Sequence, residues 1–494
     1  MGSVGERVAI IGGGIAGSAC CSAMRKRGLE CVVFEKQERA GGLWVDNYYE
    51  ATVQLPKFMY EYPEIRFGKK VSKFPSMMEV CEYVDEFNAM QEIQSCFRFR
   101  TKVKKAEKES DSVWALYVED MDTGATTVEK FSWLVVCTGM FSSKPKRIKF
   151  LGSESFKGII IHSSEYRSPN IFNGKKVVVI GGGKSGIDAA RAASAVADEV
   201  VHVCRTRMWS IPEKLGPLPL APLFLSRLGC WILPPYYLDS GPVQMLHTLF
   251  RPLKLVIALL MELIFLIQLN VPYSAWPNIR FAEETLRSNT TMLDEKYLDA
   301  VRNGKVQVRK HQVEEIKPSS VKLSEGSDAE ADVIVLATGW EHGFQELFDK
   351  DIAEKVAMEK DGLYIYKNIL PADIDRLAFV GSNIAPLAAP FTVTIQSVWL
   401  AQLVAGHRLK PTIAEMTEDI EKLKANRRRY WPFEECRGAV VQGHMFGYCD
   451  DLLQDMSVST KRRGFMNWLK YWFKPNIPLF WKEIVQEAHV ARKL

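Results

Sequence analysis

VAIIGGGIAG, residues 8–17, and VVVIGGGKSG, residues 177–186, are the two stretches that decide the fold of this chain. In each, an apolar β-branched run leads into a glycine-rich turn, and a helical pattern follows. This strand, turn and helix context makes a GxGxxG match specific for a dinucleotide site. Two such matches predict an α/β protein with two dinucleotide-binding, Rossmann-like domains.

The glycines of each turn have separate roles. The first permits a tight turn, the second lets backbone approach a pyrophosphate, and the third lets the helix pack on the strand, with the phosphates at the helix N-terminus. The sequence therefore predicts phosphate-binding turns at Gly12, Gly14 and Gly17, and again at Gly181, Gly183 and Gly186.

The residues that follow the second strand of each unit distinguish the two ligands. Glu35 ends the run CVVFE about 20 residues after the first turn, where a carboxylate accepts hydrogen bonds from ribose hydroxyls. The equivalent strand of the second unit ends at Arg205, Thr206 and Arg207, which offer the positive charge that a 2′-phosphate needs. We interpret the first site as one for FAD or NAD(H) and the second as one for NADPH. For each charged residue, the alternative is a solvated surface position.

Composition and charge narrow the function classes. The 494 residues are 47% apolar and 25% charged, an ordinary globular balance for two to four domains. A net charge of +5, without a basic stripe carrying interleaved aromatic residues, gives no indication of nucleic-acid binding. The ten cysteines form no CxxC pair, so we expect buried thiols in a reducing compartment and no metal site. Because residues 1–5 lead directly into the first strand, we expect an intracellular protein.

Later strands suggest how the domains are arranged. The strand-Thr-Gly pattern that ends at Gly139 recurs before Gly339, and another buried strand ends at Gly381. These late strands resemble the closing part of the first domain, so we predict an NADPH domain inserted into a split FAD domain. The expected boundaries are 1–165 and 326–460 for the FAD domain, 166–325 for the NADPH domain with an apolar insertion at about 215–290, and 461–494 for a basic, aromatic tail.

With these features the chain resembles the single-component, class B flavin-containing monooxygenases. The most specific matching element is the fingerprint Phe156-x-Gly158-x-x-x-His162-x-x-x-Tyr166, in which the Baeyer–Villiger branch ordinarily has Trp at the last position. The resemblance implies that Gly42, Leu43 and Trp44 lie along FAD, and that Ser185 belongs to the NADPH turn.

The resemblance also implies an activity. NADPH reduces FAD, O2 adds to the reduced flavin as a C4a-hydroperoxide, and one oxygen atom passes to a nucleophilic nitrogen or sulfur. We expect a small, lipophilic substrate and an activity like that of N,N-dimethylaniline monooxygenases. Two alternatives are a Baeyer–Villiger or oxidative-decarboxylating enzyme and a non-oxygenating FAD/NADPH redox or binding protein. A pyridine-nucleotide disulfide reductase would need a redox CxxC, which this sequence lacks.

Three side chains receive specific expectations from the resemblance. Many relatives have Asn where this chain has Gln54, with the amide near the oxygenated edge of the flavin; Gln presents the same groups on a longer stem. We favour His162 as an imidazole that fixes the linker between domains through hydrogen bonds, rather than one that transfers protons. Tyr166 is expected to pack and to hydrogen-bond.

Two segments bear on membrane association. Residues 253–269 form an apolar run that is too short and too interrupted by charge for a confident spanning helix. Its alternatives are a buried core or substrate-pocket helix and an interfacial helix that gathers apolar substrate from a membrane. Residues 461–474 mix basic and aromatic side chains, as headgroup-level anchors do, although a helix packed on the FAD domain fits as well. Peripheral attachment to the cytoplasmic side of a membrane such as the endoplasmic reticulum is therefore one expectation.

Overall fold

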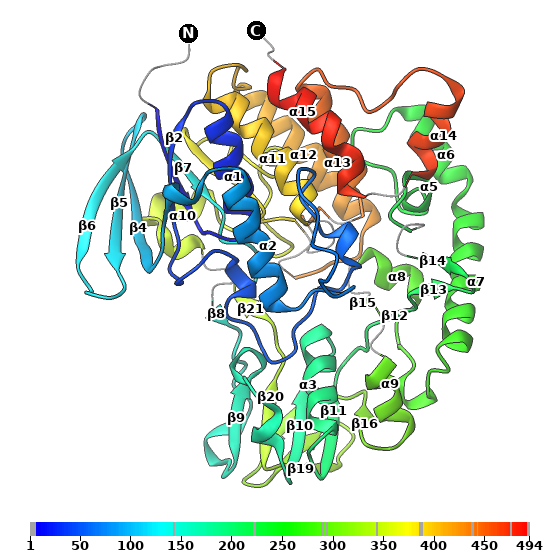
Figure 1. Ribbon diagram of the computed structural model, residues 1–494. Helices are drawn as coiled ribbons and strands as arrows, with labels where there is room; N and C mark the ends of the chain where they lie inside the picture. The colour runs from blue at the N-terminus through cyan, green and yellow to red at the C-terminus, as the bar shows by residue number, and fades with distance from the viewer. Residues whose placement is uncertain are drawn as a thin grey trace.

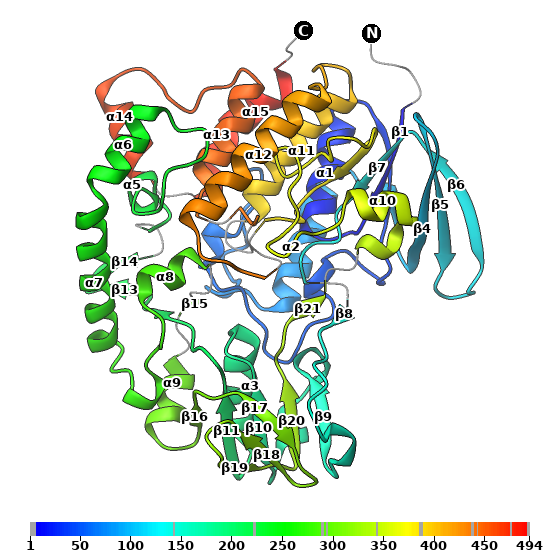
Figure 2. The same ribbon diagram turned by 180° about the vertical axis from the view of Figure 1, so that it is seen from behind.

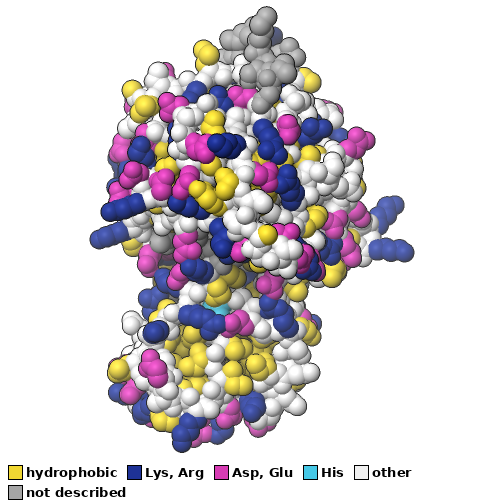
Figure 3. Space-filling view, turned by 90° about the vertical axis from the view of Figure 1, so that its left-hand side faces the viewer, with side chains coloured by type: hydrophobic (Ala, Val, Ile, Leu, Met, Phe, Trp, Pro, Cys, Tyr) yellow, Lys and Arg dark blue, Asp and Glu magenta, His cyan; other side chains and the backbone are white. Residues whose placement is uncertain are grey.

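Two lobes of unequal size make up the chain, and they meet at a narrower waist (Figure 3). The computed structural model describes residues 6–141, 144–220, 224–287, 291–292, 295–341, 344–384, 389–435, 439–441, 443–474 and 477–491. Residues 1–5 and Cys436 lie outside these ranges, so the expectations that rest on them stay predictions. Each lobe is built on one five-stranded parallel sheet, which confirms the predicted α/β fold with two Rossmann-like units.

The sheet of the larger lobe has the strand order β22-β7-β1-β2-β3, with all neighbours parallel. Its strands are β1 (Arg7–Ile11), β2 (Glu30–Phe34), β3 (Phe97–Arg98), β7 (Trp133–Val136) and β22 (Leu377–Phe379). The central strands β1 and β7 are almost entirely buried apolar residues because helices or further strands cover both faces of the sheet. The turn after β1 is the first glycine-rich stretch.

The sheet of the smaller lobe repeats this design with the order β9-β20-β10-β11-β16, again fully parallel. Its strands are β9 (Ile159–His162), β10 (Lys176–Ile180), β11 (Glu199–Val203), β16 (Gln307–Arg309) and β20 (Val333–Leu336). The second glycine-rich stretch follows β10, which occupies the central position that β1 has in the larger lobe.

The predicted boundary between the domains needs a correction. The strand before Gly339 is β20, which pairs with β10, so it belongs to the second unit and not to the first. The strand β9 also joins the second sheet, so this unit begins before residue 166 and extends beyond residue 325. The physical reason is that each unit needs its own closing strand beside its first strand; β7 closes the larger lobe and β20 the smaller one. The strand β22 does pair with β7, as expected for a split first domain.

A three-stranded antiparallel sheet precedes the closing strand in both units. In the larger lobe its strands are β4 (Thr101–Ser110), β5 (Val113–Asp120) and β6 (Thr126–Phe131); in the smaller lobe they are β17 (Val313–Ile316), β18 (Ser320–Leu323) and β19 (Asp328–Glu330). The two lobes are therefore similar in topology over much of their length.

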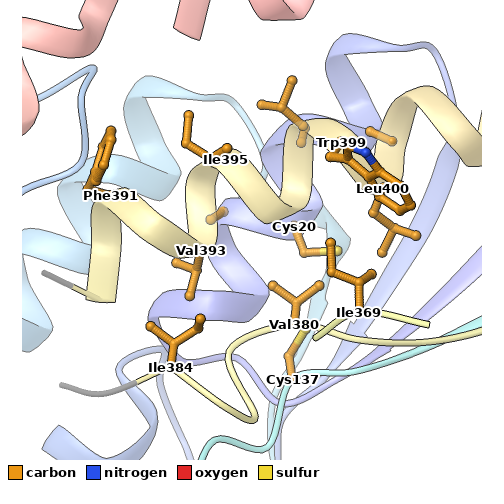
Figure 4. Close-up of a cluster of buried hydrophobic side chains, with 14 of the residues drawn as sticks. Cys20, Cys137, Ile369, Val380, Ile384, Phe391, Val393, Ile395, Trp399 and Leu400 are labelled. Atoms are coloured by element: carbon orange, nitrogen blue, oxygen red, sulfur yellow. The ribbon is translucent and has the colours of Figure 1, made fainter. Parts of the chain in front are cut away.

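The core of the larger lobe is centred on α11 (Ala389–Val404), which crosses α1 (Ile15–Lys26). Nearly every side chain of α11 is buried, as expected of a helix that is apolar on all sides. Figure 4 shows Phe391 and Trp399 of α11 with Cys20 of α1 and the strand-end residue Val380. The other helical elements of this lobe are α2 (Met77–Met90), α10 (Lys350–Lys355), α12 (Ile413–Tyr430), α13 (Met445–Asp455), α15 (Lys482–Val490), η1 (Gly42–Trp44), η2 (Lys57–Met59), η3 (Gln94–Cys96), η8 (Phe344–Leu347) and η9 (Pro478–Trp481).

The apolar insertion reaches from the smaller lobe to the larger one. Its long helix α7 (Arg251–Gln268) runs along one edge of the molecule, and α5 (Arg227–Cys230), α6 (Gly241–Leu249) and α14 (Phe465–Phe473) gather near its upper end (Figures 1 and 2). Arg227 anchors the insertion through a two-bond contact with Asp450 of α13. The remaining elements of this region and of the smaller lobe are α3 (Lys184–Ser194), α8 (Phe281–Leu286), α9 (Glu295–Arg302), β12 (Ser210–Ile211), β13 (Lys214–Leu215), β14 (Leu218–Pro219), β15 (Thr291–Met292), η4 (Ser153–Ser155), η5 (Ser163–Glu165), η6 (Pro169–Phe172) and η7 (Tyr273–Ala275).

Two antiparallel segments, β8 (Lys144–Pro145) and β21 (Trp340–Glu341), form the waist. The first leads the chain into the smaller lobe and the second leads it back (Figure 1). The backbone amide of Lys146 donates to the carbonyl of Gly339 at 2.9 Å, which ties the two segments together. The waist is thus where the position of one lobe relative to the other is set.

Candidate functional site

The first glycine-rich turn has the geometry of a phosphate cradle. Gly12 has φ +105°, and a Cβ at this position would lie 2.7 Å from the carbonyl oxygen of Cys137. A Cβ on Gly17 would lie 1.9 Å from the Gly12 carbonyl oxygen, so only glycine lets α1 start this close to the strand. Gly14 caps α1 without any side-chain hydrogen bond. The first backbone N–H groups of α1 are therefore not capped by a side chain, as an anion site requires.

The predicted segment Gly42, Leu43 and Trp44 lies against this turn. A Cβ on Gly14 would be 3.4 Å from the Cα of Gly42, which itself has φ +58°. Glycine backbone therefore faces glycine backbone, which leaves the approach to the helix N-terminus narrow and free of side chains. Trp44 is half-buried, and its indole Nε1 donates to the Tyr60 hydroxyl at 3.3 Å.

Glu35 stands beside the same turn. Its carboxylate is 4% exposed and accepts from the backbone amides of Gly13 at 2.6 Å and Gln37 at 2.9 Å. Each carboxylate oxygen has a second lone-pair site, so both retain the capacity to accept from a ribose hydroxyl. The structure thus brings together Glu35 and the glycines that the sequence predicted for the first site.

The second turn is built in the same way. Gly181 has φ +134°, and a Cβ there would lie 2.1 Å from the carbonyl oxygen of Ala337. A Cβ on Gly186 would lie 2.0 Å from the Gly181 carbonyl oxygen, whereas one on Gly183 would meet nothing within 4 Å. Gly183 caps α3 without a side-chain hydrogen bond, and Ser185 lies half-buried in the first turn of that helix. The open side of Gly183 is the side on which a pyrophosphate would lie.

The residues predicted for the 2′-phosphate separate into two groups. Arg205 and Thr206 are exposed and lie next to the turn, since a Cβ on Gly182 would be 2.2 Å from the Thr206 carbonyl oxygen. Arg207 is different. It is 1% exposed, and its guanidinium donates to the Met208 carbonyl at 2.9 Å and lies over the Tyr297 ring. The expectation for Arg207 is therefore wrong, because its charge is directed into the protein interior.

His202, which the sequence analysis missed, supports the second turn from the neighbouring strand β11. It is fully buried in β11, with Nε2 2.8 Å from the Gly181 carbonyl oxygen and Nδ1 2.7 Å from the Tyr297 hydroxyl. Nε2–H thus donates to Gly181, and Nδ1 accepts from Tyr297. Burial lowers the pKa of His202 to about 4, so the neutral ring that this arrangement needs is stable at physiological pH.

The fingerprint residues build the start and end of β9. A Cβ on Gly158 would lie 2.1 Å from the Asp332 carbonyl oxygen and 2.7 Å from the ring of Phe156, so this glycine allows the edge strand to approach. His162 ends β9 fully buried, with Nδ1 2.8 Å from the Ser164 hydroxyl and Nε2 3.1 Å from the Gly339 carbonyl oxygen. Burial lowers its pKa. The imidazole therefore holds the returning linker at the waist, which agrees with a positioning role.

Tyr166 lies where the two lobes touch. Its buried ring stacks on Tyr48 at a centroid distance of 5.9 Å, and its hydroxyl has no hydrogen-bond partner among the residues that the structure describes. Only the packing half of the expectation for this residue therefore matches the geometry. The Tyr48 hydroxyl donates to Asp188 of α3 at 2.8 Å, and Glu50 pairs with Arg191 one helical turn later. Sequence reasoning missed Tyr48, because no local pattern distinguishes a residue that contacts another lobe.

Comparisons with known proteins give the family of this chain. The profile of the family described as "Flavin-binding monooxygenase-like" matches residues 5–468. The chain belongs to this family. It is 27% identical to flavin-containing monooxygenase 3 of Oryctolagus cuniculus over 92% of this chain and 83% of the relative, and 25% identical to a probable flavin-containing monooxygenase 1 of Arabidopsis thaliana over 95% of each chain.

Solved structures of flavin monooxygenases share the fold. An S-allyl-L-cysteine S-oxygenase from Allium sativum has a TM-score of 0.63 at 20% identity, and covers 100% of this chain and 97% of its own. An open crystal structure of cyclohexanone monooxygenase has a TM-score of 0.68 at 17% identity, with 92% and 98% coverage. At these identities the likeness concerns the fold alone.

Family membership identifies the class of chemistry. The protein is an NADPH-dependent flavin monooxygenase with FAD and NADPH as cofactors, and its co-substrates are O2 and a small molecule. Both glycine cradles fit such cofactors, because each offers an uncapped helix N-terminus beside a turn without side chains. Gln54 is half-buried between Val53 and Leu55, which are both buried in the larger lobe. Its position relative to a flavin stays a prediction.

Proposed function

We propose that this flavin monooxygenase transfers oxygen to a nitrogen or sulfur atom of a small, lipophilic metabolite, with an activity of the N,N-dimethylaniline monooxygenase kind. The observation that carries the proposal is Tyr166 at the end of the fingerprint, buried against Tyr48 at the contact between the lobes. The Baeyer–Villiger branch ordinarily has Trp at this position. The names of the curated relatives support the same assignment.

The cofactor assignment follows from the residues beside each turn. FAD would bind at the larger lobe, where Glu35 would accept from its ribose and the N-terminus of α1 would face its pyrophosphate. NADPH would bind at the smaller lobe, where Arg205 and Thr206 would face its 2′-phosphate and α3 its pyrophosphate. Bound together, these cofactors supply the hydride and the activation of O2. The contribution of the chain is to hold them across the waist and to exclude water.

Gln54 has a separate part in this proposal. Its side-chain amide would hydrogen-bond at the oxygenated edge of a bound flavin and would favour oxygen transfer to substrate over release of peroxide. The flanking residues Val53 and Leu55 are buried, and the backbone amide of Val53 donates to the Pro75 carbonyl at 2.9 Å. These contacts limit how far Gln54 can move, which offsets the longer stem of Gln relative to Asn.

The decisive experiment measures products with labelled oxygen. The purified holoenzyme is incubated with NADPH, ¹⁸O2 and, in turn, N,N-dimethylaniline, an aryl methyl sulfide and cyclohexanone. We expect one labelled oxygen atom in an N-oxide or sulfoxide and NADPH consumption that matches product. A labelled lactone from cyclohexanone, with no N- or S-oxide, would establish the Baeyer–Villiger alternative. Flavin reduction without label in any product would establish a non-oxygenating redox protein.

The exposed helices of the insertion support peripheral membrane attachment as a further part of this proposal. The helix α7 is oriented opposite to an ordinary surface helix, which buries its apolar face. Its Lys254 is buried, with Nζ 2.8 Å from His247 Nδ1, whereas leucines along the helix face outward. The expectation of a buried core or pocket helix is therefore wrong. Exposed apolar side chains of α6 and α7 in the insertion and of α14 in the C-terminal tail include Met245, Leu246, Leu249, Leu253, Leu255, Val256, Leu260, Leu263, Ile267, Phe465, Met466, Trp468 and Phe473.

A lipid surface is the occupant we assign to this face. Many exposed apolar side chains on neighbouring helices (Figures 1 and 2) mark an interaction site in a soluble protein, and exposed basic residues accompany them in sequence, including Arg251, Lys461, Arg463 and Lys474. Apolar anchoring with basic flanks fits the cytoplasmic leaflet of a membrane such as the endoplasmic reticulum. Within the described part of the chain, no helix is both long and apolar enough to cross a membrane.

Vesicle sedimentation tests this attachment. The protein should pellet with phosphatidylserine-containing vesicles, resist high salt and be released by detergent, because burial of apolar side chains is worth about 25 cal/mol per Å². The double variant Leu260→Ser/Leu263→Ser should lose binding, while Leu409→Ser, an exposed leucine outside this face, should retain it. Full recovery of the parent protein in the supernatant would refute the lipid assignment. So would a parent protein that is a dimer in solution when the double variant is a monomer.

A further inference from the structure

Three cysteine side chains meet in the larger lobe. Cys21 lies in α1, Cys31 near the start of β2, and Cys96 ends η3. All three are free thiols, and their sulfur atoms lie within 4.8 Å of one another, with 3.5 Å between those of Cys21 and Cys31. Among the described residues, no other group of His, Cys, Asp and Glu side chains has such ligand spacing.

This cluster is separate from the residues that we assign to FAD. Cys21 comes about two helical turns after Gly14, on the order of 10 Å along the axis of α1. Cys31 is the second residue of β2, whereas Glu35 follows the other end of that strand. The thiols therefore lie near the amino ends of the strands. Dinucleotides bind at the carboxyl ends, on the opposite side of the sheet. Nothing in the proposed oxygenation uses them.

The spacing of the sulfur atoms matches a metal site. A metal–thiolate bond of about 2.3 Å places three sulfurs around one ion at about 4 Å from each other. Thiolates select soft ions, above all Cu(I) and Zn(II). The described chain adds no fourth His, Cys, Asp or Glu ligand to the group. A three-coordinate site of this kind suits Cu(I), whereas Zn(II) would need water as a fourth ligand.

The surroundings also fit metal binding. Cys21 and Cys31 are buried, which shields a bound ion, while Cys96 is half-buried and provides access. On binding, each cysteine would lose its proton to the solvent, because thiolates and not thiols are the ligands.

We propose that Cys21, Cys31 and Cys96 form a three-thiolate site for one soft metal ion, with Cu(I) preferred over Zn(II). The ion would join α1, β2 and η3, three elements that the chain brings together from distant positions. Because an ion that binds only the folded state stabilises it by mass action, the site would act as a clamp on the larger lobe. The lack of CxxC spacing explains why the sequence predicted no metal.

Metal titration of the purified, reduced holoenzyme tests the proposal. Cu(I), supplied anaerobically with a chromophoric competitor, and Zn(II) are titrated in separate arms. We expect about one equivalent of Cu(I) to survive gel filtration, an ultraviolet thiolate-to-metal absorption band, and a higher melting temperature. Cys96→Ser should lose at least tenfold in Cu(I) affinity with unchanged flavin content. Cys230→Ser, a half-buried cysteine outside the cluster, should bind as the parent does.

Three outcomes would overturn the site. The first is failure of both Cu(I) and Zn(II) to bind at one equivalent. The second is parental affinity in Cys96→Ser, which would locate the metal elsewhere. The third is a Cys21–Cys31 disulfide in peptide maps of the protein as isolated, which would identify the cluster as a redox pair. Flavin content and melting temperature, measured on each variant, distinguish these results from loss of folding.

Discussion

The hydroxyl of Tyr48 donates a 2.8 Å hydrogen bond to the buried carboxylate of Asp188, and this bond joins the loop after η1 in the larger lobe to α3 in the smaller one. Asp188 also pairs with Lys184, which is next to the cap of α3 at Gly183. The loop that follows Trp44 is therefore connected to the turn that we assign to NADPH through Asp188 and Lys184. Hydride transfer between the two cofactors depends on the position of one lobe relative to the other. A change in this contact therefore tests whether that position controls the reaction.

Tyr48→Phe should slow NADPH-driven flavin reduction while FAD stays bound. Loss of one hydrogen bond costs about 1 kcal/mol, or roughly a fivefold rate effect if the bond is needed for the reactive alignment. Anaerobic stopped-flow reduction measures this rate. Tyr117→Phe is a matched control, since Tyr117 donates a 2.8 Å bond to Glu107 on the β4–β6 sheet. Equal rates for both variants and the parent would show that the Tyr48 contact does not align the cofactors.

The two glycine cradles should respond separately to a methyl group. Gly14→Ala should give colourless protein, because the added carbon occupies the space between Gly14 and Gly42 where backbone approaches the pyrophosphate. Gly183→Ala should keep its flavin and raise the KM for NADPH, since this Cβ would point into open space in the second cradle. Flavin absorbance and steady-state kinetics check both. Retention of FAD at parental stoichiometry in Gly14→Ala would contradict the assignment of the first site.

Arg205 and Arg207 should differ in what their loss changes. Arg205→Ala should raise the KM for NADPH tenfold or more and leave NADH kinetics nearly unchanged, because a charge-assisted contact is worth about 1.5 to 3 kcal/mol. Arg207→Ala should instead lower the melting temperature, since it leaves buried partners such as Ser210 unsatisfied. Similar losses with NADH and NADPH for Arg205→Ala would remove that residue from the 2′-phosphate site.

Acid should weaken the second cradle through His202. The folded-state pKa of about 4 lies below the ordinary value of 6.5, so the stabilisation is complete above about pH 6.5 and is lost as pH falls toward 4. The full loss is about 3 kcal/mol. Urea unfolding of the parent and of His202→Gln at several pH values should show a stability difference that shrinks on acidification. His311→Gln, at a more exposed histidine, is the control, and a constant difference for His202→Gln would exclude this linkage.

The sequence predicted what local chemistry determines. Each glycine-rich turn and the charged residue beside it belong to one strand-turn-helix unit. The structure places Glu35 beside the first turn and Arg205 near the second. Arg207 was misjudged because its partner Tyr297 is distant in sequence, and no pattern within the strand shows which of two neighbouring arginines turns inward.

Strand assignment failed for a different reason. The same strand-Thr-Gly pattern follows β7 and β20. In a chain with two similar units, the second copy of this pattern fits either unit equally well. Only the pairing with β10 decides. The contact between Tyr48 and Asp188 and the meeting of the three cysteines arise from tertiary packing alone, which periodicity and spacing do not encode.

Gln54→Ala separates oxygen transfer from flavin reduction. If the amide lies over the oxygenated edge of the flavin, its loss should leave anaerobic reduction by NADPH nearly unchanged, because hydride arrives from the smaller lobe. Product yield per NADPH should fall, and hydrogen peroxide should account for the difference. Gln54→Asn keeps a side-chain amide at this position and should retain most of the coupling that Gln54→Ala loses. Gln94→Ala, on the surface, should behave as the parent does. Equal peroxide and product yields in Gln54→Ala and the parent would place Gln54 outside the oxygenating site.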